Sequence, residues 1–371
     1  MKNCGIICEY DTFHNGHKYM IDEVKRTENC GVVCVMSGEF TQRAKPSVHS
    51  KEIRAKNAVN NGADVVLELP FPFSSMSAEL FASAGVRIIA KCGMCDRIAF
   101  GSECADIRLL HQTAEILLDD GFSEKLKAAQ SDDRTLSFAR ARSLVMENAY
   151  GKQYSDVLSS PNDILAVEYI KANLKLGEPL RPVVVARTVK RDSRDGAFAS
   201  SSVIRERLGN GEDVSDLVPE NCDMSGIFTR DEEFFRAMIV SLMLRSASQT
   251  ESCAEVPKGS GHAILKNARA CGSYEELCKK LSSKSFTDAK VRRMLLFSFL
   301  GVDKAFIKAV PLYTGILCYS DMGRKMLSES RKERSIIVSS RVSNIRTSAS
   351  AYEQYAVCER AAEVLCKCRS K

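Results

Sequence analysis

Short apolar runs alternate with amphipathic patterns through the first half of the chain. The runs cover residues 5–8, 31–36, 65–69, 97–100 and 182–189. Their lengths are typical of buried strands, whereas the segments between them repeat apolar positions every three to four residues, as surface helices do. Strands that alternate with helices in this way predict a doubly wound parallel sheet, so we expect a Rossmann-like α/β fold.

The pattern changes beyond residue 221. Strand-like runs fade, and helical periodicity covers residues 234–245, 274–281, 289–300 and 352–366. Small and polar residues between positions 246 and 261 predict an exposed connection. We therefore expect two domains, an α/β domain over residues 1–221 and a mainly helical domain over residues 222–371.

Two histidines flank a glycine where the first expected strand meets the first expected helix. His14, Asn15, Gly16 and His17 stand between the apolar run and the amphipathic pattern. A helix N-terminus attracts anions, and glycine lets a nucleotide approach the backbone closely. Two imidazoles at such a point can donate hydrogen bonds to ATP phosphates as pyrophosphate leaves. A histidine in a turn is more often structural than catalytic, but this position after a strand favours a catalytic role.

Polar residues also follow other expected strands. Because the carboxyl ends of parallel strands meet at one edge of a sheet, ligands bind there, and the residues that follow the strands should converge. These residues are Ser37 and Gly38, then Gly101, Ser102 and Glu103, and finally Arg187, Lys190 and Arg191. We expect them to surround the two histidines.

A serine run marks the start of a further helix. Ser200, Ser201 and Ser202 precede an amphipathic pattern, and Arg205 follows about one turn later. A role as helix N-cap explains one of the serines but not the arginine. Serine hydroxyl groups at a helix start, together with an arginine, can instead form a binding site for phosphates. Asn162 opens another expected helix, where it either caps the helix or contacts a base or ribose. Both interpretations stay open from the residues alone.

The composition is that of an ordinary globular protein. The chain has 371 residues, of which 44% are hydrophobic and 27% charged. No apolar run approaches the ~20 residues of a membrane span, and no signal-peptide pattern is present, so we expect a cytoplasmic protein without a membrane partner. The 15 cysteines are scattered, and the pair Cys92 and Cys95 lacks a second, correctly spaced pair. We expect reduced packing residues and no metal site.

Positive charge gathers in the C-terminal third. The net charge of +6 is modest, but basic residues cluster there with few acids between them. Several clusters in one helical region are typical of a phosphate-backbone footprint and also of solvated helix faces, so the charge pattern alone leaves both interpretations open. The residues that we expect to contact RNA are Arg292, Arg293, Arg331, Lys332 and Arg334.

Several blocks along the chain together resemble one family. Residues 14–17 and 200–205 are similar to the two signatures of the HIGH-type nucleotidylyltransferase superfamily, whose sheet is a Rossmann-like fold of the HUP type. Within it, the chain resembles the bacterial tRNA(Met) cytidine acetate ligase family. The matching blocks cover residues 5–17, 36–43, 61–70, 100–103, 160–165 and 289–301. The block at 61–70 is far more specific than the superfamily signatures.

The resemblance implies a two-step reaction. ATP, with Mg²⁺, and acetate form acetyl-adenylate, and the acetyl group then passes to N4 of the wobble cytidine of elongator tRNA(Met) to give N4-acetylcytidine. His14 and His17 are the implied catalytic residues, nearest the phosphates. The implied ATP site comprises Ile7, Cys8, Glu9, Tyr10, Phe13, His14, Gly16, His17, Met20, Gly101, Ser102, Asn162, Arg187, Ser201, Ser202 and Arg205.

The chain departs from the family pattern at two points. Asp11 and Thr12 stand where the family usually has Asn and Pro. Asp11 brings negative charge near a triphosphate, which is costly unless a lysine or Mg²⁺ offsets it. The stretch 187–196 also diverges, so the phosphate-side arginine is either Arg187 or Arg191.

Two other functions stay open. A small-molecule adenylyltransferase of the same superfamily would share the nucleotide site, but such enzymes are usually shorter and lack a basic helical extension. A non-catalytic RNA-binding or nucleotide-binding protein on the same fold would not need both histidines. The residues do not identify the acyl donor, the tRNA or the oligomeric state.

Overall fold

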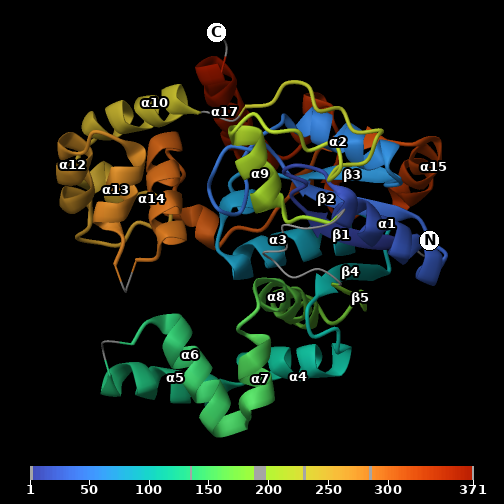
Figure 1. Ribbon diagram of the computed structural model, residues 1–371, viewed down its shortest axis with the longest axis horizontal. Coiled ribbons are helices and arrows are strands. Elements are labelled where there is room, and N and C mark those ends of the chain that lie inside the picture. Colours follow the sequence, from blue (N-terminus) through green and yellow to red (C-terminus); the bar gives the residue numbers. More distant parts are fainter. Residues whose placement is uncertain (1–2, 134–135, 188–197, 229–230, 284–285, 370–371) are drawn as a thin grey trace.

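A six-stranded sheet forms the centre of the computed structural model, which describes residues 3–133, 136–187, 198–228, 231–283 and 286–369 (Figure 1). The strand order is β5-β4-β1-β2-β3-β7. The strands are β1 Cys4–Cys8, β2 Val32–Ser37, β3 Val65–Leu69, β4 Arg97–Ser102, β5 Arg181–Ala186 and β7 Ile316–Tyr319. Neighbours pair in parallel except β7, which runs antiparallel to β3. The expected Rossmann-like parallel sheet is confirmed.

The end of β1 lies where the direction of winding reverses. From β1 the chain adds β2 and β3 on one side, and it then crosses back to add β4 and β5 on the other side. Such a switch point is where doubly wound sheets bind ligands, because the loops on either side diverge and leave room there. The histidine motif follows β1 directly, so the fold places it at this point.

Helices cover both faces of the sheet. They are α1 Asn15–Glu28 and α2 Lys51–Asn60 on one face, and α3 Ala78–Lys91 and α8 Pro161–Lys175 on the other. Successive strand residues point to opposite faces, so Cys34 packs toward α1 and α2 whereas Val35 packs toward α3 and α8. Gly5 lets α3 approach β1, since a Cβ there would lie 2.5 Å from the Ile89 side chain.

Most expected elements agree with the structure. The five strands are present, although the last of them ends at Ala186, and residues 188 and 189 lie outside the described residues. The four expected helices correspond to α10 Glu232–Met243, α13 Tyr274–Leu281, α14 Asp288–Leu300 and α17 Ala349–Arg369. The exposed connection expected over residues 246–261 is wrong, because this stretch forms α11 Ala247–Glu251 and buries Cys253 and Val256.

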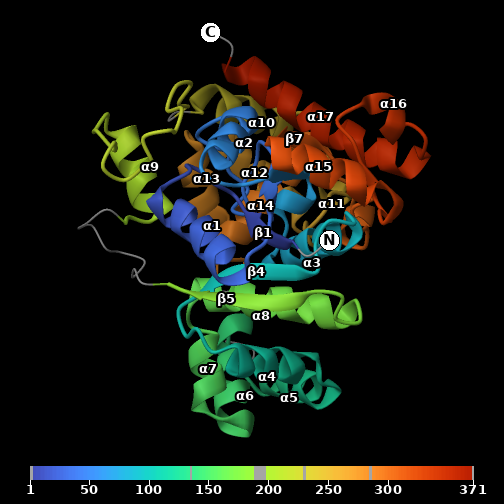
Figure 2. The same cartoon turned by 90° about the vertical axis from the view of Figure 1, so that its right-hand side faces the viewer.

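Four helices between β4 and α8 form an insertion that the sequence analysis did not separate from the sheet. They are α4 Ile107–Leu118, α5 Asp120–Asp132, α6 Phe138–Tyr150 and α7 Lys152–Val157. The insertion has a small core of its own, formed by Phe122, Val145, Met146 and Leu158. Figure 2 shows it below β5 and α8, away from the rest of the molecule.

The C-terminal part returns to the sheet. β7 pairs with β3, and the Thr314 hydroxyl donates a hydrogen bond to the Glu68 carbonyl oxygen at 2.7 Å. The division expected at residues 221 and 222 stays a prediction, but the second part is not only helical. Further elements are α9 Ser201–Gly209, α12 Gly261–Ala270, α15 Asp321–Glu329, α16 Val342–Ile345, β6 Tyr313–Thr314, β8 Ile337–Val338 and the 3-10 turns Phe73–Ser75, Lys304–Ile307 and Ser330–Lys332.

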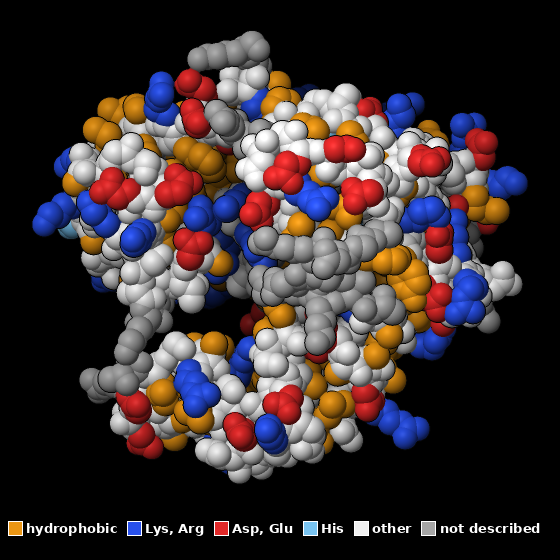
Figure 3. Space-filling model, viewed as in Figure 1, with side chains coloured by type: hydrophobic (Ala, Val, Ile, Leu, Met, Phe, Trp, Pro, Cys, Tyr) orange, Lys and Arg blue, Asp and Glu red, His pale blue; other side chains and the backbone are white. Residues whose placement is uncertain are grey.

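The surface is hollowed between α10 to α14 and the remainder of the molecule. Figure 3 shows this hollow on the face that is viewed in Figure 1, with Lys and Arg side chains around it. Within the described ranges, no helix has the length and apolar character needed to cross a membrane. Most of the cysteines lie in the cores or pack against them.

Candidate nucleotide site

The loop after β1 is shaped by buried aromatic rings. Tyr10 adopts a left-handed backbone conformation with φ 48° and is 2% exposed. Its ring contacts those of Phe13 and His17 at centroid distances of 4.9 and 4.8 Å. Its hydroxyl lies 3.3 Å from the Cys34 sulfur on β2. Tyr10 and Phe13 therefore form the floor on which the histidines lie.

A buried arginine beneath this loop joins the ends of β1 and β2. Arg54, on α2, is fully buried and donates hydrogen bonds to the carbonyl oxygens of Glu9 at 2.6 Å, Ser37 at 3.1 Å and Gly38. These carbonyl groups lie at strand ends, where no sheet partner satisfies them. The sequence analysis missed Arg54, because a single arginine in a helical pattern gives no sign of burial.

The two histidines together cap the N-terminus of the first helix. His14 is the N-cap of α1, and its Nδ1 accepts a hydrogen bond from the Gly16 N–H at 3.1 Å. The His14 N–H in turn donates to Nδ1 of His17 at 3.3 Å. The rings stack with centroids 3.6 Å apart at an angle of 22°. The His-x-Gly-His spacing thus works as a capping box, with histidines in place of the usual Ser and Glu.

These hydrogen bonds fix where the imidazole protons lie. A backbone N–H can only donate, so Nδ1 of each ring is the acceptor and the proton of each neutral ring lies on Nε2. His14 Nε2 is 3.0 Å from the Ser201 hydroxyl oxygen on α9. It donates to that oxygen and leaves the Ser201 O–H to donate elsewhere. His17 carries its proton on Nε2, at the helix N-terminus.

Both histidines are neutral at neutral pH. Burial, followed by the positive charges of Arg187 and Arg205, lowers the pKa of His14 to about 3. Burial also lowers the pKa of His17 well below its ordinary value, with His14 and the same two arginines adding to the effect. Positive charge therefore gathers around the start of α1, which favours an anion there.

Because of these histidines, we expect the protein to become less stable as the pH is lowered. Their folded pKa values lie below the unfolded value of about 6.5, so the unfolded chain binds more protons between the two values. Stability is thus full above pH ~6.5 and is lost as the pH falls toward the folded value, by up to about 1.4 kcal/mol per pH unit for each histidine. Urea unfolding at several pH values should show a shallower decline for His14→Gln than for the wild type. Equal slopes would contradict the assignment.

Arg205 reaches from α9 to the loop after β1. Its guanidinium donates to the Asp11 carbonyl oxygen, lies 3.5 Å from the Asp11 carboxylate and donates to the Ser202 hydroxyl at 3.4 Å. Asp11 is 4% exposed and also accepts a hydrogen bond from the Val48 N–H at 2.6 Å. The charge of Asp11 is therefore offset by Arg205, a residue far away in the chain.

Arg187 lies on the other side of the histidines, at the end of β5. The space beside Gly101 is filled by Arg187, since a Cβ on Gly101 would lie 3.2 Å from that side chain. Arg187 Nε lies 3.6 Å from the Glu103 carboxylate, which accepts a hydrogen bond from the Asn162 amide at 2.6 Å. The expected convergence of strand ends is therefore present for Arg187. Arg191, the alternative arginine, and Lys190 lie outside the described residues.

Ser102 has a structural role that the sequence did not indicate. It is fully buried, donates to the Asp163 carboxylate and accepts a hydrogen bond from the Ala105 N–H at 3.0 Å. Asp163 also accepts from the Glu103 N–H at 2.9 Å. Ser102 and Asp163 therefore hold the turn after β4 in place, and through it they hold Glu103.

Three other residues of the expected site support the loop from below. Ile7 packs on α3, where Gly85 leaves room for it. Cys8 and Met20 pack against the core on the α1 side of the sheet. These contacts give the loop a fixed base, so the side chains above it keep their positions.

The two carboxylates nearest the loop are already engaged. Glu9 accepts a hydrogen bond from the Gln42 N–H at 2.5 Å, and burial raises its pKa. Asp11 pairs with Arg205. Among the described residues, no three His, Cys, Asp or Glu side chains are placed to hold a metal ion. Because Mg²⁺ favours phosphate oxygens and free carboxylates, the residues present do not build a metal site of their own.

The basic residues expected to contact RNA do not form one surface. Arg292 and Arg293 lie on α14, whereas Arg331, Lys332 and Arg334 lie in and after the turn that follows α15. Figure 1 shows α14 and α15 on opposite sides of the molecule. Arg331 and Lys332 are exposed.

Two of these arginines are used within the fold. Arg293 is 8% exposed and forms an ion pair with Glu255 at 2.8 Å, so the expectation of an RNA contact is wrong for Arg293. Arg334 donates to the Leu327 carbonyl oxygen and to the Ser330 hydroxyl. The partner of Arg293 lies 38 residues away in the chain, so the local charge pattern could not indicate that pair.

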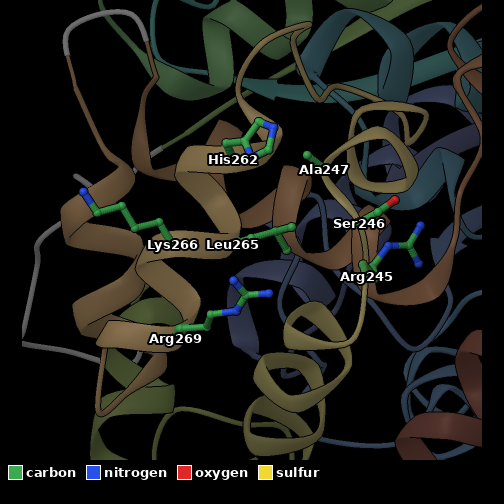
Figure 4. A pocket seen from close by; sticks show the side chains of 7 residues that line it. All are labelled: Arg245, Ser246, Ala247, His262, Leu265, Lys266 and Arg269. Atoms are coloured by element: carbon green, nitrogen blue, oxygen red, sulfur yellow. The ribbon is translucent and has the colours of Figure 1, made fainter.

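A separate cavity of about 650 Å³ lies away from the histidines, between the end of α10 and α12 (Figure 4). It is lined by Arg245, Ser246, Ala247, His262, Leu265, Lys266 and Arg269. The four residues from α12 share one helix face, and Figure 4 shows Lys266 pointing away from Arg245. The cavity has cations but no glycine turn or histidine pair, so its chemistry differs from that of the loop after β1.

Comparison with known proteins places these features in a family. The HIGH Nucleotidyl Transferase family model matches residues 1–370. The tRNA(Met) cytidine acetate ligase of Acetivibrio thermocellus is 33% identical over 365 residues, which cover 91% of this chain and 87% of the relative. The protein of the same name from Clostridium perfringens (strain ATCC 13124) is 32% identical over 369 residues, with 94% and 91% covered.

Solved structures agree with the family match. Apo TmcAL from Thermotoga maritima has a TM-score of 0.93 and 28% identity, with 100% of this chain and 96% of that chain covered. The same protein bound with alpha-thio ATP has a TM-score of 0.86 and 28% identity, with 96% and 92% covered. The chain therefore belongs to the HIGH nucleotidyl transferase family and, within it, to the tRNA(Met) cytidine acetate ligases.

Proposed function

We propose that this protein is an ATP-dependent ligase that acetylates N4 of the wobble cytidine of elongator tRNA(Met), using acetate as the acyl donor. The observation that carries the proposal is the group formed by His14, His17, Arg187, Ser201 and Arg205 at the switch point of the sheet. The relatives named above and the ATP analogue bound by one solved neighbour support it.

In this proposal the triphosphate lies over the N-terminus of α1. His17 Nε2 and the Ser201 hydroxyl supply hydrogen-bond donors, and Arg187 and Arg205 supply positive charge from two sides. Because the fold fixes these groups before ATP binds, they stabilise charge on the departing pyrophosphate without having to reorganise. An acetate oxygen bonds to the α-phosphorus, the bond to pyrophosphate breaks, and acetyl-adenylate results. The histidines donate as neutral imidazoles and do not transfer a proton.

The second step passes the acetyl group to the RNA. The N4 atom of cytidine attacks the acetyl carbon, AMP leaves with the electrons of the broken C–O bond, and N4 loses one proton. Holding the two reactants together makes the weakly nucleophilic amine effective. An anticodon loop can present an unstacked base more easily than a duplex can. We propose Arg331 and Lys332 as further RNA contacts because they are exposed, and a tRNA substrate supports a cytoplasmic location.

Incubation with ATP, labelled acetate and an elongator tRNA(Met) transcript should give labelled N4-acetylcytidine, measured by mass spectrometry of the nucleosides. A transcript with uridine at the wobble position is the matched control, because it lacks the N4 amine and should stay unlabelled. Label in another nucleoside, or none at all, would contradict the proposal. Pyrophosphate exchange that needs a phosphorylated small acceptor instead of acetate would favour a small-molecule adenylyltransferase.

A further inference from the structure

A short hairpin follows β2 and contacts both the loop after β1 and α10. Phe40 and Pro46 form an isolated antiparallel bridge. The Thr41 N–H donates to the Lys45 carbonyl oxygen at 2.9 Å, and the Ala44 N–H donates to the Thr41 carbonyl oxygen at 2.9 Å. Ala44 closes the turn in the left-handed region with φ 55°. These bonds hold the tip of the hairpin, residues 42–45, in one conformation.

The base of the hairpin is anchored on both sides. Phe40 is fully buried, and its ring lies 5.4 Å from that of Phe71 and 5.6 Å from that of Phe234 on α10. The Gln42 N–H donates to the Glu9 carboxylate of the loop after β1, at 2.5 Å. These contacts attach the hairpin to both the nucleotide site and the helical part. The position of its tip is therefore fixed relative to both.

The tip carries two exposed cations, Arg43 and Lys45. Neither side chain makes an ion pair with a carboxylate of the described residues. Burial and then the charges of Arg292 on α14 and Arg205 on α9 lower the pKa of Lys45. The acidic groups that oppose this effect are Asp288 and Glu275.

Positive charge in this space is only partly balanced. Asp288 is already paired with Arg292 at 2.7 Å. Arg205 is likewise paired with Asp11 at 3.5 Å, so Arg43 and Lys45 are the cations here without a carboxylate partner among the described residues. An anion bound beside them would supply the missing opposite charge. In the proposed function, Arg205 faces the ATP phosphates. The anion beside the hairpin is therefore a second one, and the phosphate backbone of the RNA substrate has the charge that fits there.

We propose that Arg43 and Lys45 bind backbone phosphates of the RNA substrate and so position its anticodon loop beside acetyl-adenylate. The inference rests on the proposed function. It assigns the hairpin to the second half-reaction, whereas the histidines and Ser201 act in the first. Arg43 and Lys45 are positioning residues in this proposal, since neither one touches the atoms that react.

The test compares the two half-reactions in the full-length protein. For Arg43→Ala/Lys45→Ala we expect the KM for elongator tRNA(Met) transcript to rise about tenfold, as for the loss of a charge-assisted hydrogen bond. The salt dependence of RNA binding should fall by a slope of about 0.7 for each lost contact. The KM for ATP in acetate-dependent pyrophosphate exchange should change less than about twofold. The single substitution Lys45→Arg should keep much of the RNA affinity that the double alanine variant loses, because it keeps the charge.

Lys125→Ala/Lys127→Ala on α5 is the matched control, since it removes two exposed cations far from the hairpin. An equal loss of RNA affinity in that control would overturn the proposal in favour of net charge. Unchanged KM and salt slope in the hairpin variant, with an active wild type, would overturn the hairpin assignment alone. A parallel loss of exchange would also overturn it, by moving Lys45 to the ATP step. A wild type that exchanges pyrophosphate but never acetylates RNA would overturn the proposed function and this inference together.

Discussion

Replacing His17 with alanine should lower acetate-dependent exchange of pyrophosphate into ATP by about 10²–10³-fold, the usual cost of removing one fixed donor from a developing charge. Nδ1 of His17 accepts the His14 N–H at 3.3 Å, so Nε2 bears the proton of the neutral ring. Alanine removes that donor and also the Nδ1 acceptor of the His14 N–H, so the melting temperature of the variant is measured beside its activity. Exchange of labelled pyrophosphate at saturating ATP and acetate measures the effect on the first half-reaction alone.

His111→Ala is the matched control for this substitution. His111 lies on α4 in the helical insertion, where it contacts Glu178 at 3.1 Å, and its loss should leave exchange unchanged. His17→Gln keeps an N–H donor on a side chain of similar length and should recover part of the lost activity. A His17→Ala protein that melts normally and exchanges pyrophosphate like the wild type would remove this histidine from the mechanism.

Arg205→Met should weaken both ATP binding and the fold. The substitution leaves the Asp11 carboxylate, 4% exposed, without its cation. Breaking a buried pair in this way costs about 3 kcal/mol, at the lower end of the usual range because Arg205 is itself partly open to solvent. Loss of a cation that faces the phosphates should also raise the Kd for ATP. Thermal unfolding and ATP titration measure the two effects separately.

A second substitution separates the structural effect from the binding effect. Asp11→Asn in the Arg205→Met background removes the unpaired charge while keeping an oxygen that can accept the Val48 N–H. Stability should return toward the wild type, whereas ATP affinity should stay low. If Arg205→Met lowers the melting temperature but leaves the Kd for ATP unchanged, Arg205 serves only to neutralise Asp11.

Local patterns were enough to predict the parts of the site that lie close together in the chain. The strand, the loop and the helix around His14 and His17 follow one another directly, so apolar periodicity located them. The rule that parallel strand ends converge brought Arg187 and the start of α9 to the same place. What the chain does not reveal is which distant residue satisfies which charge.

Several of the features that the sequence did not predict share one physical cause, which is pairing between residues far apart in the chain. Arg54, buried under the loop, and Arg293, paired with Glu255, look like surface residues in the sequence. The partner of Asp11 lies 194 residues away on α9. β7 is a short apolar run of only four residues, and nothing near it in the chain shows that it pairs with β3.

The position of β7 at the edge of the sheet constrains the order in which the chain can fold. β3 ends at residue 69, yet its edge partner begins at residue 316. During synthesis the backbone groups along that edge must wait for most of the chain to emerge, and an open strand edge is a site of mispairing between chains. Contacts this distant in sequence also slow folding, because a long loop must close before they form. The sheet that carries the nucleotide site is therefore completed only by β7, which is synthesised long after β3.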